Sequence, residues 1–335
     1  MKRGTESVAD GTVADPILEV EGLRKYFPIQ GGILNRTVGN VKAVDGVSFE
    51  IGDGETLGLV GESGCGKSTL GRTVLRLHEP TGGWIRYRGT DITDASKAEL
   101  KRYRREMQVI FQDPASSLNP RLSVGKIIRE PMHSLTDWSR EKRHARTVEL
   151  VEEVGLGTEH LGRAPHELSG GQQQRVGIAR ALSINPRFVV ADEPTSALDV
   201  SVQASILNLL NDLQAEYDLT FLLISHDLSV VRHSADRIAV MYLGKLAEVA
   251  PTDQLFESPK HPYTKALLSS VPRAGPERME DRILLEGSVP SPENPPSGCR
   301  FHPRCQEYIG PVCEEDEPVF EEVADGHRCA CHHYE

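Results

Sequence analysis

Nine consecutive residues combine glycines with hydroxyl side chains and a single lysine. The segment consists of Gly61, Glu62, Ser63, Gly64, Cys65, Gly66, Lys67, Ser68 and Thr69. Glycines let the backbone curl so that its N–H groups face phosphate oxygens, and a helix that begins here adds the positive end of its dipole. Lys67 is expected to reach the β- and γ-phosphates, and the Ser68 hydroxyl to ligate Mg²⁺. The alternative, a tight turn without ligand, is disfavoured by the apolar strand before this phosphate loop and the helical spacing after it.

A pair of acidic residues stands at the end of an apolar run. Phe188-Val-Val-Ala leads directly into Asp192 and Glu193. An apolar strand that runs into aspartate is the usual Mg²⁺-side partner of a phosphate loop, so Asp192 is predicted to act on the metal, mostly through water. Glu193 is placed to orient or deprotonate an attacking water. Taken alone, the pair also fits a strand end with two solvated acids.

Another glycine-containing segment opens a helical pattern. Ser169, Gly170, Gly171 and Gln172 directly precede the helix-like stretch QQRVGIARALS. A serine and two glycines at a helix start offer backbone N–H groups to an anion. A second phosphate site has no partner within one chain, so this segment is predicted to close on the nucleotide of a facing subunit.

The elements that hold these residues alternate between strand and helix. ILEVEGL, VKAVDGVSFEI and GGWIRYRGTDI are strand-like, and the phosphate loop separates a short strand from a helix. The stretch from about Ala95 to Leu182 has a mostly helical pattern broken by Gly and Pro. From Pro186 onward the pattern gives strand, helix, strand, helix and a hairpin. This alternation predicts an α/β domain with a mainly parallel sheet and an inserted helical subdomain.

The composition is that of a folded protein with one large domain and an appendage. The chain has 335 residues, of which 38% are hydrophobic and 26% charged, and its net charge is -11. No apolar run approaches the about 20 residues of a membrane helix, and the N-terminus lacks a secretory apolar region. The acidic balance counts against nucleic-acid binding. Residues 1–15 are expected to form a flexible terminus, and residues 272–296 an extended linker.

Five motifs occur in the order GESGCGKST, IFQDP, LSGGQ, DEPTSALD and ISHD, and together they resemble those of ABC-transporter ATPases. The resemblance covers roughly residues 17–251. It implies an ABC-cassette P-loop NTPase over residues 16–255, with a RecA-like core, an antiparallel β subdomain and a helical subdomain at about 113–182. It also implies that the chain binds ATP and Mg²⁺ and hydrolyses ATP when two such subunits pair.

The resemblance assigns roles to residues at matching positions. Gln112 would sense Mg²⁺ and the γ-phosphate and couple to a membrane partner, and His226 would contact the γ-phosphate. Residues 169–172 would contact the nucleotide of the facing subunit, and residues 196–199 would link the two sites. The implied catalytic residues are Lys67, Gln112, Glu193 and His226, and the implied Mg²⁺ residues are Ser68, Gln112 and Asp192.

An aromatic ring is expected to stack on the adenine base near the first strand. Within Leu23-Arg-Lys-Tyr-Phe, Phe27 corresponds best to this position, and Tyr26 is the second choice. A packed surface aromatic is the alternative explanation for Phe27.

Three further features resemble the ATPases of oligopeptide/dipeptide (nickel) importers. They are the long insertion at residues 28–49, which favours the F-type subunit, the motif His261-Pro262-Tyr263, and the Cys-rich tail of the C-terminal region, residues 256–335. The resemblance implies a D-type second ATPase, two transmembrane permease subunits and an extracytoplasmic solute-binding protein. The chain would then be a peripheral subunit at the cytoplasmic face of the cell membrane that energises import of di- or oligopeptides. Import of nickel or oligosaccharides and a soluble, non-transport ABC ATPase are the alternatives.

Five of the six cysteines lie in this tail: Cys299, Cys305, Cys313, Cys329 and Cys331. Disulfides are disfavoured in a reducing compartment, and structural zinc usually shows closer cysteine pairs, although nearby histidines keep zinc open. An iron–sulfur cluster needs four thiolates and tolerates irregular spacing. The family resemblance implies a [4Fe–4S] cluster on Cys299, Cys305, Cys313 and Cys331, with Cys329 as an extra thiol. Metal-free thiols are the remaining interpretation.

Overall fold

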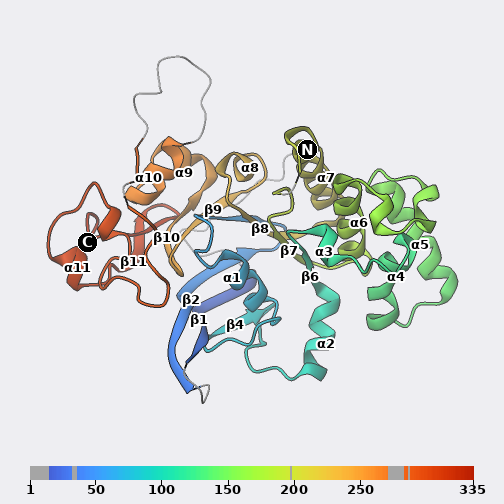
Figure 1. The fold of residues 1–335 in the computed structure, drawn as a ribbon, viewed down its shortest axis with the longest axis horizontal. Coiled ribbons are helices and arrows are strands. Elements are labelled where there is room, and N and C mark those ends of the chain that lie inside the picture. The colour runs from blue at the N-terminus through green and yellow to red at the C-terminus, as the bar shows by residue number, and fades with distance from the viewer. Residues whose placement is uncertain (1–14, 32–35, 197, 271–282, 286) are drawn as a thin grey trace. The chain divides into compact units, whose positions relative to one another are not determined.

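The computed structural model in Figure 1 describes residues 15–31, 36–196, 198–270, 283–285 and 287–335. Nearly all of the terminus predicted to be flexible, and much of the predicted linker, lie outside the described residues. The chain divides into a first unit, Met1–Asp53 with Leu57–Thr93 and His226–Glu335, and a second unit, Gly54–Thr56 with Asp94–Ser225. The domain limits predicted from the sequence, 16–255 and 256–335, are a different division and stay a prediction.

An antiparallel sheet in the first unit has the strand order β2-β1-β4-β5. Its strands are β1 (Pro16–Gly31), β2 (Arg36–Gly52), β4 (Gly82–Tyr87) and β5 (Thr90–Asp91). Val20 on β1 lies opposite Phe49 on β2 and Ile85 on β4, and all three are buried. Such cross-strand apolar pairs fix the register of the sheet. The sheet carries Tyr26 and Phe27 on β1, which lies beside β2 and β4 in Figure 1.

Further strands of the first unit pair in the order β11-β12-β10-β9-β3. They are β3 (Thr56–Val60), β9 (Arg237–Tyr242), β10 (Lys245–Pro251), β11 (Phe320–Ala324) and β12 (His327–Ala330). β3 runs parallel to β9, and the remaining neighbours are antiparallel. Leu243 and Gly244 join β9 to β10 with φ of 42° and 81°, the left-handed backbone of a tight hairpin turn. The hairpin predicted from the sequence is therefore confirmed.

The helices of the first unit are short. They are α1 (Lys67–Val74), α8 (Leu228–Arg232), α9 (Thr252–Glu257), α10 (Pro262–Ser269) and α11 (Val312–Glu315), and a 3-10 turn lies at His302–Arg304. The His-Pro-Tyr motif starts α10: Nδ1 of His261 accepts the N–H of Tyr263 at 3.0 Å, and Pro262 occupies the first turn, where no N–H is needed. Complete burial lowers the pKa of His261 to about 4, so its ring stays neutral and able to accept.

The second unit contains three parallel strands in the order β8-β7-β6. They are β6 (Met107–Ile110), β7 (Phe188–Asp192) and β8 (Thr220–Ser225). Its helices are α2 (Lys97–Glu106), α3 (Pro114–Ser117), α4 (Val124–Leu135), α5 (Arg140–Glu153), α6 (Gly170–Leu182) and α7 (Val200–Tyr217). α4 packs on α5 and α6, and α3 packs on α6. The stretch predicted to be mostly helical thus carries α2 to α6, but it also holds β6, whose four residues are too few to show a period.

No helix in the described parts of the chain combines the length and apolar character needed to cross a bilayer.

Candidate nucleotide-binding site

The phosphate loop connects β3 to α1, which is the strand-loop-helix order expected from the sequence. A Cβ atom on Gly61 would lie 2.1 Å from the carbonyl oxygen of Met241, and one on Gly66 would lie 2.0 Å from that of Ala43. Both glycines also have positive φ, 153° and 108°. Only glycine fits at these two positions, and this allows the backbone to turn sharply between strand and helix.

Lys67 is the first residue of α1 and is 5% exposed. Its Nζ donates hydrogen bonds to the carbonyl oxygens of Gly61 at 2.7 Å and Glu62 at 3.0 Å. The loop therefore curls around its own lysine, beside the positive end of α1. An ammonium group, a helix start and a run of backbone amides together form a donor set suited to a polyphosphate.

Glu62 makes contacts that the sequence does not reveal. Its carboxylate accepts two hydrogen bonds from the Arg304 guanidinium, at 2.7 and 3.0 Å, and its N–H donates to the Tyr263 hydroxyl at 2.8 Å. Arg304 and Tyr263 both belong to the C-terminal region, which the sequence links to the family but not to the phosphate loop. The sequence offers two signals for these contacts with Glu62: an arginine that stands among cysteines, and the Tyr of the His-Pro-Tyr motif.

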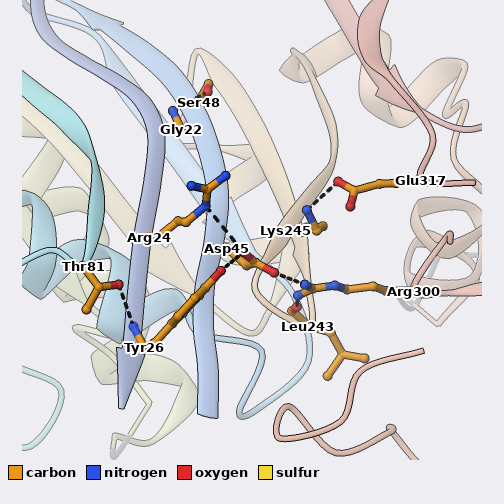
Figure 2. A network of polar contacts seen from close by, with 10 residues as sticks. All are labelled: Gly22, Arg24, Tyr26, Asp45, Ser48, Thr81, Leu243, Lys245, Arg300 and Glu317. Carbon is orange, nitrogen blue, oxygen red and sulfur yellow. Dashed lines mark hydrogen bonds and ion pairs between the residues drawn. The ribbon is translucent and has the colours of Figure 1, made fainter. Parts of the chain in front are cut away.

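The two aromatic candidates for adenine stacking differ in their surroundings. The Tyr26 hydroxyl donates to the Asp45 carboxylate, as Figure 2 shows. Burial and this hydrogen bond raise the pKa of Tyr26 to about 12. The Phe27 ring is half-buried and meets the ring of His78 edge-on, with centroids 5.6 Å apart. The Lys25 ammonium also lies 4.9 Å from the centre of the Phe27 ring. Phe27 remains the preferred stacking residue, as a prediction.

In the second unit, Gln112 and Glu193 are brought together although they are far apart in the sequence. Nε2 of Gln112 donates to Oε2 of Glu193 at 2.8 Å. Glu193 follows directly after β7 with a φ of 46°, an uncommon backbone for a residue with a side chain. Asp192, the last residue of β7, is 1% exposed. The acidic pair lies at the end of β7 and Gln112 follows β6, so the three residues predicted to act at one site lie at the same ends of two neighbouring parallel strands.

The segment 169–172 begins α6 with a reciprocal cap. The Ser169 hydroxyl accepts the N–H of Gln172 at 3.3 Å, and Oε1 of Gln172 accepts the N–H of Ser169 at 3.0 Å. Ser169 and Gly170 are exposed. A Cβ on Gly171 would lie 2.7 Å from Cγ1 of Val202, so this glycine is also required by packing. An exposed, well-formed helix start of this kind can present its first amides to an anion.

The remaining predicted site residues occupy loop and helix ends. His226 follows β8 directly and is exposed. Asp199 caps α7, since its carboxylate accepts the N–H of Val202 at 3.0 Å and the hydroxyl of Ser201 at 2.8 Å. Ala197, within the segment predicted to link two sites, lies outside the described residues. Ser68 and Thr69 lie in the first turn of α1.

Four cysteines of the tail line one small cavity: Cys299, Cys305, Cys313 and Cys331. Cys329 is not among the lining residues and lies on β12, 1% exposed. Burial raises the pKa of Cys299 and of Cys305 to about 11, and the neighbouring thiols add to this effect. All six cysteines of the chain are free thiols. The grouping of these four thiols is the one that the family resemblance selects.

The ligands of a metal ion must lie closer together than residues that line the same cavity. Across the described ranges, no three side chains of His, Cys, Asp or Glu form a group that could hold a metal ion. The thiols as placed therefore do not make a coordination shell, and the iron–sulfur cluster is not supported by their geometry.

Two family models match the chain. Residues 44–196 match the model described as ABC transporter, and residues 247–313 match the model of the oligopeptide/dipeptide transporter C-terminal region. The second match includes the His-Pro-Tyr motif and three of the tail cysteines.

Curated proteins are similar over nearly the whole chain. The oligopeptide transport ATP-binding protein AppF of Bacillus subtilis is 53% identical over 96% of this chain and 98% of that protein. The dipeptide transport ATP-binding protein DppF of Escherichia coli is 47% identical over 97% of this chain and 96% of that protein.

Solved structures agree with the fold. A dimeric ATP-binding cassette in a post-hydrolysis state, bound to ADP and phosphate, is 30% identical over 70% of this chain and 98% of its own, with a TM-score of 0.63. The protein cbiO1 from Clostridium perfringens, part of the ABC transporter complex cbiONQ, gives 27% identity over 73% of this chain and 92% of its own, with a TM-score of 0.62. The chain thus has the mixed α/β fold of an ABC cassette, and it belongs to the ABC ATP-binding proteins of the oligopeptide/dipeptide importer family.

Proposed function

We propose that this chain binds and hydrolyses ATP to energise the import of di- or oligopeptides. The observation that carries the proposal is a phosphate loop curled around a buried lysine, in a chain about half identical over its full length to peptide-transport ATP-binding proteins. As a member of the ABC ATPase family, the chain belongs to enzymes that couple nucleotide hydrolysis to movement.

The first unit supplies most of the nucleotide contacts. The amides of the phosphate loop, the start of α1 and Lys67 neutralise charge on the β- and γ-phosphates, which is the main need of phosphoryl transfer. Phe27 stacks on the adenine. Ser68, Gln112 and Asp192 offer the oxygen ligands that Mg²⁺ prefers, and this ion neutralises phosphate charge when it is bound.

The second unit supplies the residue that acts on water. Glu193 orients the attacking water, and the hydrogen bond from Gln112 holds its carboxylate in one rotamer until nucleotide binds. His226 donates to the γ-phosphate. Because Gln112 contacts Glu193 directly, a movement of the loop that carries Gln112 changes the position of the catalytic carboxylate. This contact is a physical link between a membrane partner and hydrolysis.

Closure of two ATPase subunits completes the site. The exposed start of α6, residues 169–172, contacts the γ-phosphate bound by the facing subunit, and closure excludes bulk water. The facing subunit is a homologous D-type ATPase. Two permease subunits and an extracytoplasmic solute-binding protein complete the complex, and the chain is peripheral at the cytoplasmic face of the membrane.

We propose further that the C-terminal thiols bind a [4Fe–4S] cluster through Cys299, Cys305, Cys313 and Cys331, with zinc as the alternative. Support comes from the cavity that these four residues share and from the separate position of Cys329. A bound cluster would clamp the tail and would require the thiols to move closer than they lie in this structure. Anaerobically purified protein should contain iron and acid-labile sulfide in equal amounts, whereas colourless protein with zinc would contradict the cluster.

Hydrolysis by the full-length chain together with its partner ATPase subunit tests the main proposal. Glu193→Gln should bind ATP with unchanged affinity and lose turnover by about a hundredfold or more, since a general base contributes about that much. Glu216→Gln, on the exposed face of α7, is the matched control and should hydrolyse ATP at the wild-type rate. Wild-type turnover by Glu193→Gln, or no ATP binding by the unaltered chain, would refute the proposal.

A further inference from the structure

Two arginines stand in the short segment between Cys299 and Cys305, and both are buried. The side chains of Arg300 and Arg304 are 8% and 6% exposed. A buried guanidinium is costly unless charged and polar partners surround it. The hydrogen-bond partners of these two arginines are Asp45, Glu62, Tyr242 and Leu243, which lie at least 57 positions away in the sequence.

Arg304 holds the side chain of Glu62. This bidentate salt bridge has N···O distances of 2.7 and 3.0 Å, and it fixes both the position and the plane of the carboxylate. Arg304 also donates to the Tyr242 hydroxyl at 3.4 Å. The N–H and carbonyl of Glu62 bond to Tyr263 and Lys67, so every polar group of this loop residue is engaged. Its backbone is therefore fixed before any phosphate arrives.

Aromatic packing fixes the other contact of Glu62. Tyr263 is fully buried, and its ring centroid lies 4.7 Å from that of Tyr242 and 5.3 Å from that of Phe301. Phe301 belongs to the same short segment as the two arginines. The segment thus holds Glu62 directly through Arg304 and indirectly through the hydroxyl of Tyr263.

Arg300 contacts the phosphate loop indirectly, through the β9–β10 hairpin and Asp45. It donates to the Leu243 carbonyl and to the Asp45 carboxylate, as Figure 2 shows. The next residue of the hairpin, Gly244, donates its N–H to the Cys65 carbonyl at 2.9 Å and accepts the N–H of Asp45 at 2.8 Å. Arg300 is therefore linked to the phosphate loop through Leu243 and Asp45, which adjoin or bond the Gly244 that donates to Cys65.

We propose that residues 299–305 are a brace for the phosphate loop and that Arg304 is its positioning residue, acting through Glu62 to set the affinity for the nucleotide triphosphate. The inference rests on the proposed ATP binding. A loop held in its binding geometry loses less freedom when ligand binds, so the brace raises affinity. Bound triphosphate itself orders the loop amides, so the rate of the chemical step depends little on the brace.

Nucleotide binding and kinetics of the full-length chain test this assignment. Arg304→Met and Glu62→Gln should each raise the Kd for a non-hydrolysable ATP analogue and the KM for ATP about tenfold, the loss of about 1.4 kcal/mol. The kcat should stay within about twofold, because ordered triphosphate restores the loop. Arg304→Met with Glu62→Gln should be no worse than either change alone, since both remove one pair. The control Arg328→Met removes an arginine of the same region that contacts Phe320, and should leave Kd and KM unchanged.

Hydrogen exchange separates the brace from the nucleotide function. Without nucleotide, the amides of residues 62–66 should exchange faster in Arg304→Met than in the unaltered chain and in Arg328→Met. If Arg304→Met does not fold, Glu62→Gln removes the same pair from the loop side and gives the same readout. Unchanged exchange in Arg304→Met or Glu62→Gln, or additive losses in the double variant, would overturn the brace. An unaltered chain that does not bind ATP would refute the proposed function and leave the exchange result to decide the brace.

Discussion

Acidification should weaken the first unit, and His261 is one group that causes this. The ring accepts the N–H of Tyr263 while fully buried, and burial lowers its pKa from 6.5 to about 4. Between these values the unfolded chain takes up a proton that the folded chain does not, so unfolding is favoured as the pH falls. The stabilisation is fully present above pH 6.5 and is lost progressively down to pH 4. A pKa difference of one unit corresponds to about 1.36 kcal/mol. The titration of His261 therefore lowers the free energy of unfolding by about 3 kcal/mol between pH 6.5 and pH 4.

His261→Asn isolates this contribution. Asparagine is a good helix cap and accepts the same N–H, but it does not titrate in this range. Loss of the imidazole ring lowers the stability of the variant equally at every pH. The difference in unfolding free energy between the unaltered chain and His261→Asn should therefore shrink by about 3 kcal/mol from pH 7 to pH 4. Burial raises the pKa of Glu248, but hydrogen bonds from His327 and from the backbone N–H groups at positions 260 and 261 lower it overall. These donors are present in both proteins, so most of the contribution of Glu248 cancels.

Urea denaturation followed by the fluorescence of one tryptophan gives the measurement. The chain has two tryptophans; Trp84 lies on β4 of the first unit, and Trp138 lies in the second unit. In a Trp138→Phe background, fluorescence reports the unit that contains His261. Equal pH slopes for the two proteins, or a titration of His261 near 6.5 in the folded protein, would refute the reasoning.

Other perturbations follow from the geometry of the glycines, the glutamine and the cysteines. Gly66→Ala should abolish ATP binding, because the new Cβ would lie 2.0 Å from a backbone oxygen. In the control Gly177→Ala, in α6, the new Cβ would have no atom within 4 Å, and the variant should be about 0.5–1 kcal/mol more stable in denaturation experiments. Gln112→Ala should keep ATP binding and lose stimulation of ATPase activity by permease subunits; full stimulation would contradict its coupling role. Cys305→Ser should lose bound iron, while Cys329→Ser should retain it, and the reverse pattern in a metal analysis would exclude the proposed ligand set.

The sequence predicts the local parts of the site because their chemistry needs adjacent residues. The phosphate loop requires glycine at positions 61 and 66, only five residues apart. In the structure, backbone oxygens lie too close to both positions for a side chain to fit. Asp192 and Glu193 follow an apolar strand, which is also a local pattern. The prediction of an α/β fold with a helical insertion is confirmed for the same reason, since alternating strands and helices can be read from short windows.

Contacts between distant residues could not be predicted in the same way. Glu62 and Arg304 are separated by 242 positions, and only the folded chain brings them within hydrogen-bond distance. The family resemblance prefers Phe27 to Tyr26 for adenine stacking, but the hydrogen bond of Tyr26 to Asp45 is a contact that the sequence does not reveal. The sequence does not reveal β6, because four residues are too few to show the alternation of a strand. Pairing with β7 stabilises its extended conformation.

Peptide uptake by the assembled transporter shows whether ATP hydrolysis by this chain drives import. The chain, its permease and ATPase partners and the solute-binding protein are reconstituted in vesicles, and entry of a labelled dipeptide is followed with ATP on the side of the ATPase subunits. We expect ATP-dependent uptake with the unaltered chain and none with Glu193→Gln, although that variant still binds ATP. Uptake by Glu193→Gln at the unaltered rate, or uptake that does not require ATP, would contradict this expectation.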